Sequence, residues 1–173
     1  MRKAVVILIV FGILSLALAV SLQAGSKYKP VPVYQYWNPT GNDHFYTQYF
    51  DEFEYGHPEF GTFEQVAFCV LPPEFSNGAM LYRYWNPKLQ DHYYTVHLNV
   101  YPDGTKSSDW VSEGNVGQVL KAPSNMSGAE GKRIQDLGLV PLYCYYNQEK
   151  KDHYYTLDKS ELGDGTYGWK LDK

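Results

Sequence analysis

A sequence motif of 14 residues occurs three times in this chain and restricts the possible folds more than any other feature. Its copies run from Tyr34 to Thr47, from Tyr82 to Thr95 and from Tyr143 to Thr156. In every copy the first Tyr precedes the Asp by nine residues, whereas successive Asp residues are 48 and 61 residues apart. A constant interior joined by connections of variable length indicates a repeated supersecondary unit.

Each copy has the pattern of a β-hairpin. Apolar, β-branched and aromatic residues fill its first half, which favours a strand over a helix. Asn38-Pro39 and Asn86-Pro87 are typical of a turn, and the third copy keeps Asn147 at the same position. The second half then returns as the partner strand. We expect the Asp that begins the return strand to cap the turn by accepting backbone N–H bonds, at Asp43, Asp91 and Asp152.

Three such units predict a mostly β protein, with the hairpin-based repeats in one compact pseudo-threefold domain that is β-trefoil-like. A small irregular β fold with short helices is the alternative. The repeats cover about 31–73, 79–122 and 140–173. The third repeat ends soon after Trp169, so we expect it to lack most of its closing strand. The segment from Lys121 to Leu139 has the Gly-containing composition of a surface loop.

Residues 1–24 have the pattern of a secretory signal peptide. Arg2 and Lys3 precede an apolar run from Ala4 to Val20, and a small residue, Ala24, ends the segment. An uncleaved signal anchor is the alternative, because the run approaches the ~20 residues that span a bilayer. We expect cleavage, which leaves a single three-repeat domain over 25–173 in a secreted, extracellular protein with no membrane contact.

The charge balance excludes one class of partner. Removing the leader takes away two basic residues and no acidic ones, so the net charge changes from −4 to −6. Binding to nucleic acid relies on Lys and Arg that neutralise phosphates, so we do not expect a nucleic-acid partner.

Two further features concern a secreted chain. Cys69 and Cys144 are the only cysteines, and an oxidising compartment favours a disulfide between them. Two buried thiols or a zinc site are the alternatives, and neither Cys belongs to a CxxC pair. Asn125-Met126-Ser127 matches the acceptor motif for N-glycosylation.

The Asp-His pairs suggest catalysis at first sight, because a carboxylate and an imidazole are half of a nucleophilic triad. Neighbouring residues of a strand point to opposite faces, so the Asp cannot orient the His beside it. We therefore predict a protein that is not an enzyme and holds no cofactor or metal, in which each His bonds to backbone or a Tyr hydroxyl and holds its hairpin. A metal bound by three imidazoles is the alternative. The three imidazoles are those of His44, His92 and His153.

An aromatic residue followed by Asn precedes the turn in all three copies. Tyr and Trp rings stack on sugars, and their polar tips bond to hydroxyls. We predict a non-catalytic protein that binds carbohydrate at repeated aromatic sites. Those sites are Trp37 with Asn38, Trp85 with Asn86, and Tyr146 with Asn147. The alternative is an extracellular structural or protein-interaction module whose aromatic residues are core. The expected partners are glycans or extracellular proteins.

The combined motif, Y-x-[YF]-[YWF]-N followed by a polar turn and H-[FY]-Y-T, resembles a secreted tandem-repeat family of unassigned function. The resemblance covers nearly all of the chain after the leader. It implies repeats of this size packed together, often attached to secreted hydrolases or adhesins and often supposed to bind glycans. The chain departs from the family pattern in the closing strand of its third repeat and at Gln65-Val66 in its first.

Overall fold

The computed structural model describes residues 29–58, 61–75, 78–102, 105–121, 127–136 and 138–172. The predicted signal peptide and the glycosylation acceptor Asn125 lie outside these residues. Within them, no helix is both long and apolar enough to cross a membrane.

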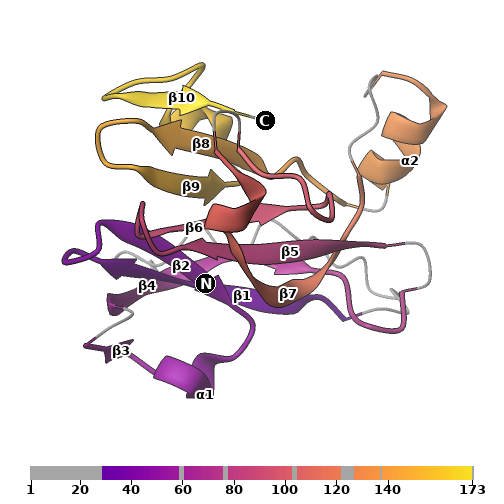
Figure 1. The fold of residues 1–173 in the computed structure, drawn as a ribbon. Coiled ribbons are helices and arrows are strands. Elements are labelled where there is room, and N and C mark those ends of the chain that lie inside the picture. The colour runs from indigo at the N-terminus through magenta and orange to yellow at the C-terminus, as the bar shows by residue number, and fades with distance from the viewer. Residues whose placement is uncertain are drawn as a thin grey trace, which may run out of the picture.

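The described chain is mostly β, as predicted, and each repeat has its own antiparallel sheet (Figure 1). The first sheet has the order β2-β1-β4-β3, the second β6-β5-β7 and the third β10-β8-β9. The strands of the first sheet are β1 (Val31–Asn38), β2 (Asp43–Thr47), β3 (Gly56–His57) and β4 (Gly61–Val70). Those of the second are β5 (Ala79–Asn86), β6 (Asp91–Thr95) and β7 (Val111–Val119). Those of the third are β8 (Tyr143–Asn147), β9 (Asp152–Thr156) and β10 (Trp169–Leu171).

All three hairpins have the same register. The first Tyr of the motif pairs with its last Thr, and the Asn before the turn pairs with the Asp after it. The last residue of the turn has a positive φ close to 58° in every copy, at Asn42, Gln90 and Lys151. The 14-residue motif therefore encodes one backbone conformation, whichever residues fill the turn.

The closing strand of the third repeat is present but short. Strand β10 has three residues and pairs with β8, whereas β4 has ten residues and β7 has nine. Trp169 pairs with Asn147, which is one position further along the hairpin than the pairing of Trp37 with Thr62. The prediction that most of this strand is missing is thus confirmed. The three residues that remain still close the repeat by pairing with β8.

Short helical segments lie in the connections. Those after the hairpins are α1 (Phe50–Phe53), η1 (Ser107–Asp109) and η2 (Lys159–Glu161). Helix α2 (Ala129–Asp136) lies in the segment predicted as a surface loop, and this part of the prediction is wrong. The glycines at 128, 131 and 138 suggested a loop, but Ala, Glu, Lys, Arg and Gln between them are good helix formers, and one internal Gly costs only about 1 kcal/mol.

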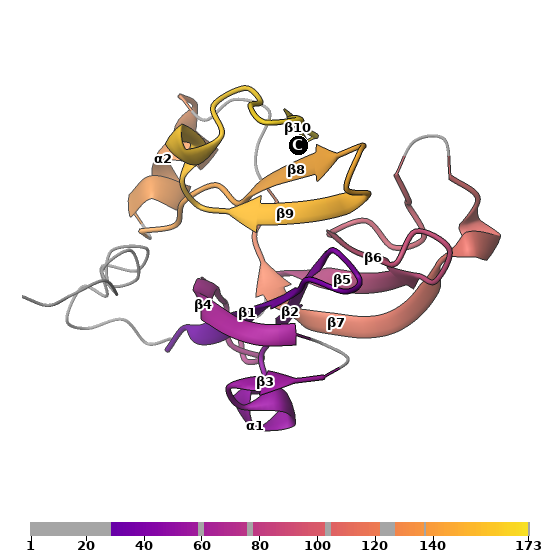
Figure 2. The same cartoon turned by 90° about the vertical axis from the view of Figure 1, so that its left-hand side faces the viewer.

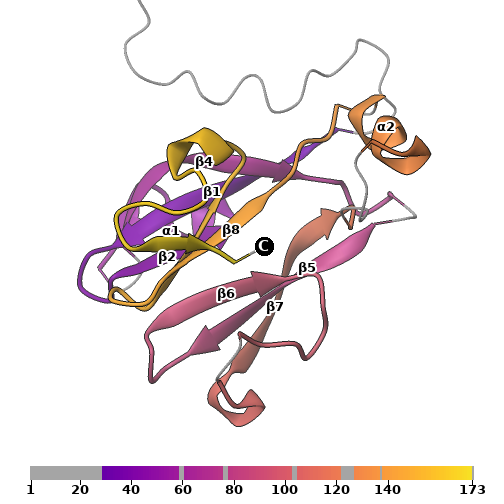
Figure 3. The ribbon, with the colours of Figure 1, turned by 90° about the horizontal axis from the view of Figure 1, so that it is seen from above.

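The return strands of the three hairpins meet at the centre of the protein. Strands β2, β6 and β9 contact one another pairwise, and Figures 2 and 3 show the three sheets grouped around them. The main core lies here and includes Tyr46, Tyr94 and Tyr155, all at most 3% exposed. A second cluster of Tyr36, Phe45 and Phe53 packs beneath α1.

A cyclic set of hydrogen bonds joins the three core tyrosines. The Tyr94 hydroxyl accepts a bond from the Tyr46 backbone N–H at 2.8 Å and donates to its carbonyl at 3.1 Å. The Tyr155 hydroxyl binds the backbone of Tyr94 in the same way, and the Tyr46 hydroxyl binds that of Tyr155. Because edge strands have unpaired backbone groups, these hydroxyls satisfy groups that would otherwise be buried without a partner.

The structure does not contain the predicted disulfide. Cys69 and Cys144 are both thiols, and they belong to different sheets. Cys69 lies in β4 opposite Pro32, and Cys144 lies in the central strand β8 with its Sγ 4.0 Å from Asp172. The closed packing of the repeats already brings the first and third repeats together, so no covalent bridge is needed to do so.

Candidate functional site

The turn of each hairpin is capped by the Asn that precedes it. The Oδ1 atom of Asn86 accepts bonds from the backbone N–H groups of Lys88 and Leu89 at 3.0 and 3.1 Å. Asn38 and Asn147 make the same pair of bonds. We predicted that the Asp would cap the turn and that the Asn, besides beginning the turn, would bind a ligand. The geometry places the Asn oxygens in the turns, and Asn86 and Asn147 are 2% exposed.

The Asp after each turn bonds instead to the His of another repeat. The Asp43 carboxylate accepts bonds from the backbone N–H of His92 at 2.9 Å and lies 2.6 Å from its Nδ1. Asp91 holds His153 in this way, with both distances between 2.7 and 3.0 Å. Asp152 holds His44 with the same distances and so closes the circle from the third repeat to the first. We call this set the Asp–His ring.

The prediction that an Asp cannot orient the His beside it agrees with this geometry. The prediction for the His residues was a bond to backbone or to a Tyr hydroxyl, and the ring shows a carboxylate as the partner instead. A buried charged pair of this kind is stable only when both members are fully hydrogen-bonded, and the backbone N–H supplies the second bond.

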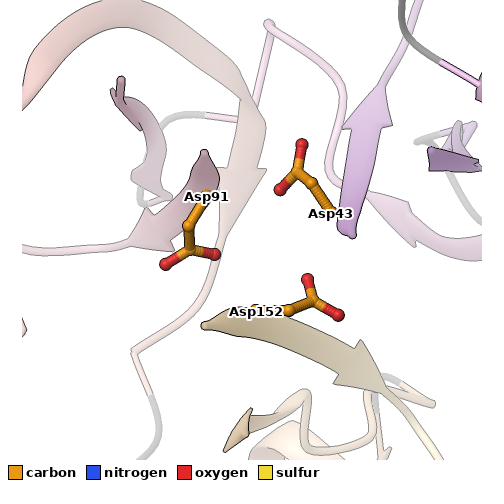
Figure 4. A group of neighbouring side chains, drawn as sticks. All are labelled: Asp43, Asp91 and Asp152. Atoms are coloured by element: carbon orange, nitrogen blue, oxygen red, sulfur yellow. The ribbon is translucent and has the colours of Figure 1, made fainter. Parts of the chain in front are cut away.

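The ring brings its three carboxylates close together (Figure 4). Asp43 is 4% exposed, while Asp91 and Asp152 are 0% exposed. One oxygen from each lies within 4.8 Å of the others, and in the described part of the chain they are the one acidic cluster with the spacing of a cation site. One oxygen of every carboxylate accepts a bond from a His backbone N–H, and the other lies 2.6–2.7 Å from the Nδ1 atom of the same His.

Aromatic rings form a second circle around the first. The residue between His and Tyr in the motif contacts the His of the next repeat, with ring centroids 4.9 Å apart for Phe45 and His92. Tyr93 with His153 and Tyr154 with His44 repeat the contact at 4.9 and 5.0 Å. The seams between repeats therefore combine ion pairs, ring contacts and tyrosine hydroxyl bonds.

Comparison with known proteins gives a family for this chain. A domain of unknown function, DUF5648, matches residues 32–173. The chain belongs to the DUF5648 family. No curated protein and no solved structure matches it. The family match covers all three hairpins, so the Asp–His ring lies entirely inside the DUF5648 domain.

The three aromatic residues singled out in the sequence occupy equivalent places in this DUF5648 domain. Trp37, Trp85 and Tyr146 each pack against the His of their own hairpin, with ring centroids 4.5 Å apart and ring planes tilted by 34–40°. All three are half-buried. Each ring has one face against a fixed imidazole, and its position is set by the Asp–His ring behind it.

An acidic residue in or directly after the closing strand completes each repeat. Glu64 accepts a bond from Gln35 at 2.6 Å, and Glu113 forms an ion pair with Arg83 at 3.0 Å. Asp172, which follows β10, contacts Cys144 at the corresponding position of the third repeat.

Glu113 extends one of the Asp–His pairs outward to the surface. Its Oε2 lies 3.3 Å from Nε2 of His92, whose Nδ1 faces Asp43. The corresponding distance from Glu64 to His44 is 4.0 Å. A line of charged groups thus runs from the buried carboxylate of Asp43 through His92 to the half-exposed carboxylate of Glu113.

A groove of about 550 Å³ lies at this end, between the first and second repeats. Trp85, His92 and Glu113 come from the second repeat and line one part of it. Asn38, Thr40, Gly41, Asp43, Pro58 and Gln90 supply the rest of the lining. A second hollow of about 340 Å³ lies beside it around the first turn and includes His57 and Thr62.

The charges of the ring predict a pH dependence of stability. Burial lowers the pKa of His92, but Asp43 and Glu113 outweigh burial and raise this pKa from 6.5 to about 9. Because the folded-state pKa is the higher one, its stabilisation is complete below pH 6.5 and is lost as the pH rises through 9. Burial and the neighbouring carboxylates raise the pKa of Asp91, which acts in the same direction at lower pH.

We therefore expect the free energy of unfolding to fall by on the order of 3 kcal/mol as the pH rises from about 6.5 to about 9.5. Urea unfolding followed by circular dichroism at several pH values measures this change. The His92→Gln variant serves as the control, since its dependence over this range should be much weaker. Stability that stays constant or increases over this range would contradict the assignment of His92 as a buried cation.

Proposed function

We propose that this domain is a secreted, non-catalytic carbohydrate-binding protein and that the groove beside Trp85 is its principal site. The observation that carries the proposal is the placement of this indole: one face is held by His92, and the ring lines an open groove with polar side chains. Sugars are bound by this combination, an aromatic face for the ring and amide, hydroxyl or carboxylate groups for the hydroxyls.

The surroundings of Trp85 favour binding because they fix the ring before a ligand arrives. Asp43 and Glu113 hold the two nitrogens of His92, and His92 supports the indole. A ligand that meets a preorganised surface does not have to order the side chains that receive it. The hydroxyl of Thr40 and the amide of Gln90 lie in the same groove and can bond to sugar hydroxyls.

The repetition of the aromatic position supports several weak sites. Trp37 and Tyr146 stack on their own histidines as Trp85 does. If the repeats are arranged in the pseudo-threefold, trefoil-like way that the equivalent contacts favour, these rings point in three directions. Linked sites that engage one glycan-rich surface gain avidity through effective concentration rather than through new contacts.

The first test is a glycan-array screen of the domain, followed by titration of the best ligand. We expect Trp85→Ala to weaken binding by about tenfold or more, because the aromatic face on which a sugar ring stacks is lost. Tyr167→Ala is the matched control, since this ring is 89% exposed and does not line the groove. A folded Trp85→Ala protein that keeps its full affinity would exclude the groove as the site.

The competing function is an extracellular structural or protein-interaction module. The half-buried state of Trp37 and Trp85 and the capping role of the Asn residues favour it, because both fit a purely structural motif. The double variant Trp37→Ala, Trp85→Ala separates the two functions. A cooperative fold without glycan binding supports the carbohydrate site, whereas an unfolded protein supports the structural role.

The extracellular location is part of the proposal and depends on residues 1–24. N-terminal sequencing of the protein recovered from the medium would show removal of the leader. Recovery of Met1 in a membrane fraction would mean that the segment is an anchor.

A further inference from the structure

The seam between the third and first repeats contains a group of four aromatic rings. Trp37 and His44 come from the first repeat, and Tyr154 and Trp169 come from the third. His44 lies 4.5 Å from Trp37, 5.0 Å from Tyr154 and 6.2 Å from Trp169 between ring centroids. Tyr154 and Trp169 are 5.7 Å apart. None of the four is fully buried, so the group is accessible from solvent.

A lysine of this chain places its ammonium group over both tryptophans. The Nζ atom of Lys150, in the turn between β8 and β9, lies 5.8 Å from the Trp37 ring centroid and 5.6 Å from that of Trp169. Cation–π attraction acts within about 6 Å of a ring centroid. The two indoles thus flank a position that already holds a cation.

Carboxylates add to the attraction for a cation at this seam. Glu64, whose side chain is 40% exposed, lies 4.0 Å from Nε2 of His44, and Asp152 lies 2.7 Å from its Nδ1. Glu161 accepts a bond from the hydroxyl of Tyr154 at 3.1 Å. Three acidic groups therefore contact rings of this group, and Lys150 is the cation that lies over its two indoles.

The other two repeats lack this combination in their sequence. The turn position of Lys150 is Gly41 in the first hairpin and Leu89 in the second. The position of Trp169 is Gly61 in the first closing strand, while the second has Trp110, which packs against Tyr93 and Tyr101. The seam between the third and first repeats is the place where two tryptophans meet a turn lysine.

We propose that this aromatic seam is a binding site for a quaternary ammonium group and that Lys150 covers the site when no ligand is bound. A trimethylammonium group is weakly hydrated, whereas the lysine ammonium is compact and strongly hydrated. Aromatic groups of this kind recognise quaternary ammonium ligands through the ring faces. The Lys150 ammonium lies near the outer limit of the cation–π range, so a better-fitting cation can displace it.

Displacement does not disturb the turn. The backbone N–H of Lys150 donates to Asn147 and its carbonyl accepts from Asn42, and both bonds persist when the side chain moves away. The site differs from the groove beside Trp85 and lies at another seam. It shares Trp37 with one of the proposed weak carbohydrate sites, but Lys150 and Trp169 belong to the ammonium site alone, so variants of these two residues test it separately.

Titration with choline chloride, followed by the indole N–H signals in ¹H–¹⁵N spectra, tests the proposal. The protein has four tryptophans, and we expect saturable shifts of Trp37 and Trp169, with Trp85 and Trp110 unchanged. Sodium chloride at equal ionic strength controls for salt. The neutral isostere 3,3-dimethyl-1-butanol should bind roughly 3- to 30-fold more weakly, the range that corresponds to the cation–π contribution.

Two variants separate the parts of the proposal. Lys150→Ala should bind choline more tightly than the wild type, because no internal cation competes. Lys151→Gln is its matched control, since Gln90 has the same positive φ in the second repeat, and it should not change the affinity. Trp169→Leu keeps an apolar side chain but removes the π face, and it should abolish binding in a protein that remains folded.

Three results would overturn the proposal. The first is the absence of saturable choline shifts in both the wild type and Lys150→Ala. The second is equal affinity for choline and the neutral isostere. The third is weaker choline binding by Lys150→Ala, because it would make the lysine a supporting group rather than a competitor.

Discussion

Replacing Asp91 by Ala is expected to lower the free energy of unfolding by roughly 3–5 kcal/mol. The carboxylate is 0% exposed, accepts the backbone N–H of His153 at 3.0 Å and lies 2.7 Å from Nδ1 of that residue, which is itself 1% exposed. Its removal takes away the partner of both buried groups. Domains of this size are stable by about 5–15 kcal/mol, so the loss is a large part of the total.

Relief of repulsion among the three carboxylates opposes this loss. Burial and the charges of Asp43 and Asp152 raise the pKa of Asp91, which shows that its charge is costly in this place. We expect the loss to prevail, because Asp91 is the partner of two buried groups of His153, the backbone N–H and Nδ1. Asp91→Asn, which keeps an acceptor for the backbone N–H, should cost less than Asp91→Ala.

Chemical unfolding of both variants measures the effect, and Glu149→Ala is the control. Glu149 is exposed in the turn that precedes Asp152, and only its backbone N–H takes part in capping. Wild-type stability of Asp91→Ala would show that the Asp–His ring contributes nothing to the fold.

The second large effect is expected from removing one hydroxyl oxygen. Tyr94→Phe deletes the group that binds both the backbone N–H and the carbonyl of Tyr46, at 2.8 and 3.1 Å. Phe keeps the aromatic ring but has no group that can bond to either backbone atom. Each buried backbone group left without a partner costs about 1–3 kcal/mol, and we expect a loss of roughly 2–6 kcal/mol for the two.

Thermal and urea unfolding measure this loss, and Tyr167→Phe provides the comparison. The Tyr167 ring is 89% exposed, so deleting its hydroxyl should leave the midpoint unchanged. Equal midpoints for Tyr94→Phe and Tyr167→Phe would mean that the tyrosine bonds at the centre have no net value.

The local structure of each repeat could be read from the sequence because the hairpin motif is self-contained. Alternation and a turn of constant length define which residues pair, and Tyr34 to Thr47 has that register in the structure. The same reasoning showed that Asp43 does not orient His44. It could not name His92 as the true partner, because strand alternation says which face a side chain occupies but not which neighbouring repeat covers that face.

Two other details depended on information that a single sequence does not hold. Asn and Asp side chains both accept bonds from backbone N–H groups, so residue type alone could not show that Asn86 caps the turn while Asp91 bonds to another repeat. Asp172 could not be predicted because the strand that it follows has only three residues, too few for alternation to be visible. The half-buried state of Trp85 results from the imidazole beneath it, which the sequence does not place.

The cyclic packing of the hairpins has a consequence for how the domain loses its structure. In an open solenoid the terminal repeats have one neighbour each, so they can unfold alone at the cost of one interface. Here the bonds from Asp152 to His44 give the last repeat the first as a second neighbour. The array has no terminal unit, and the departure of any single repeat breaks two of the three seams. Unfolding should therefore occur in one step, without partly folded forms that retain two repeats.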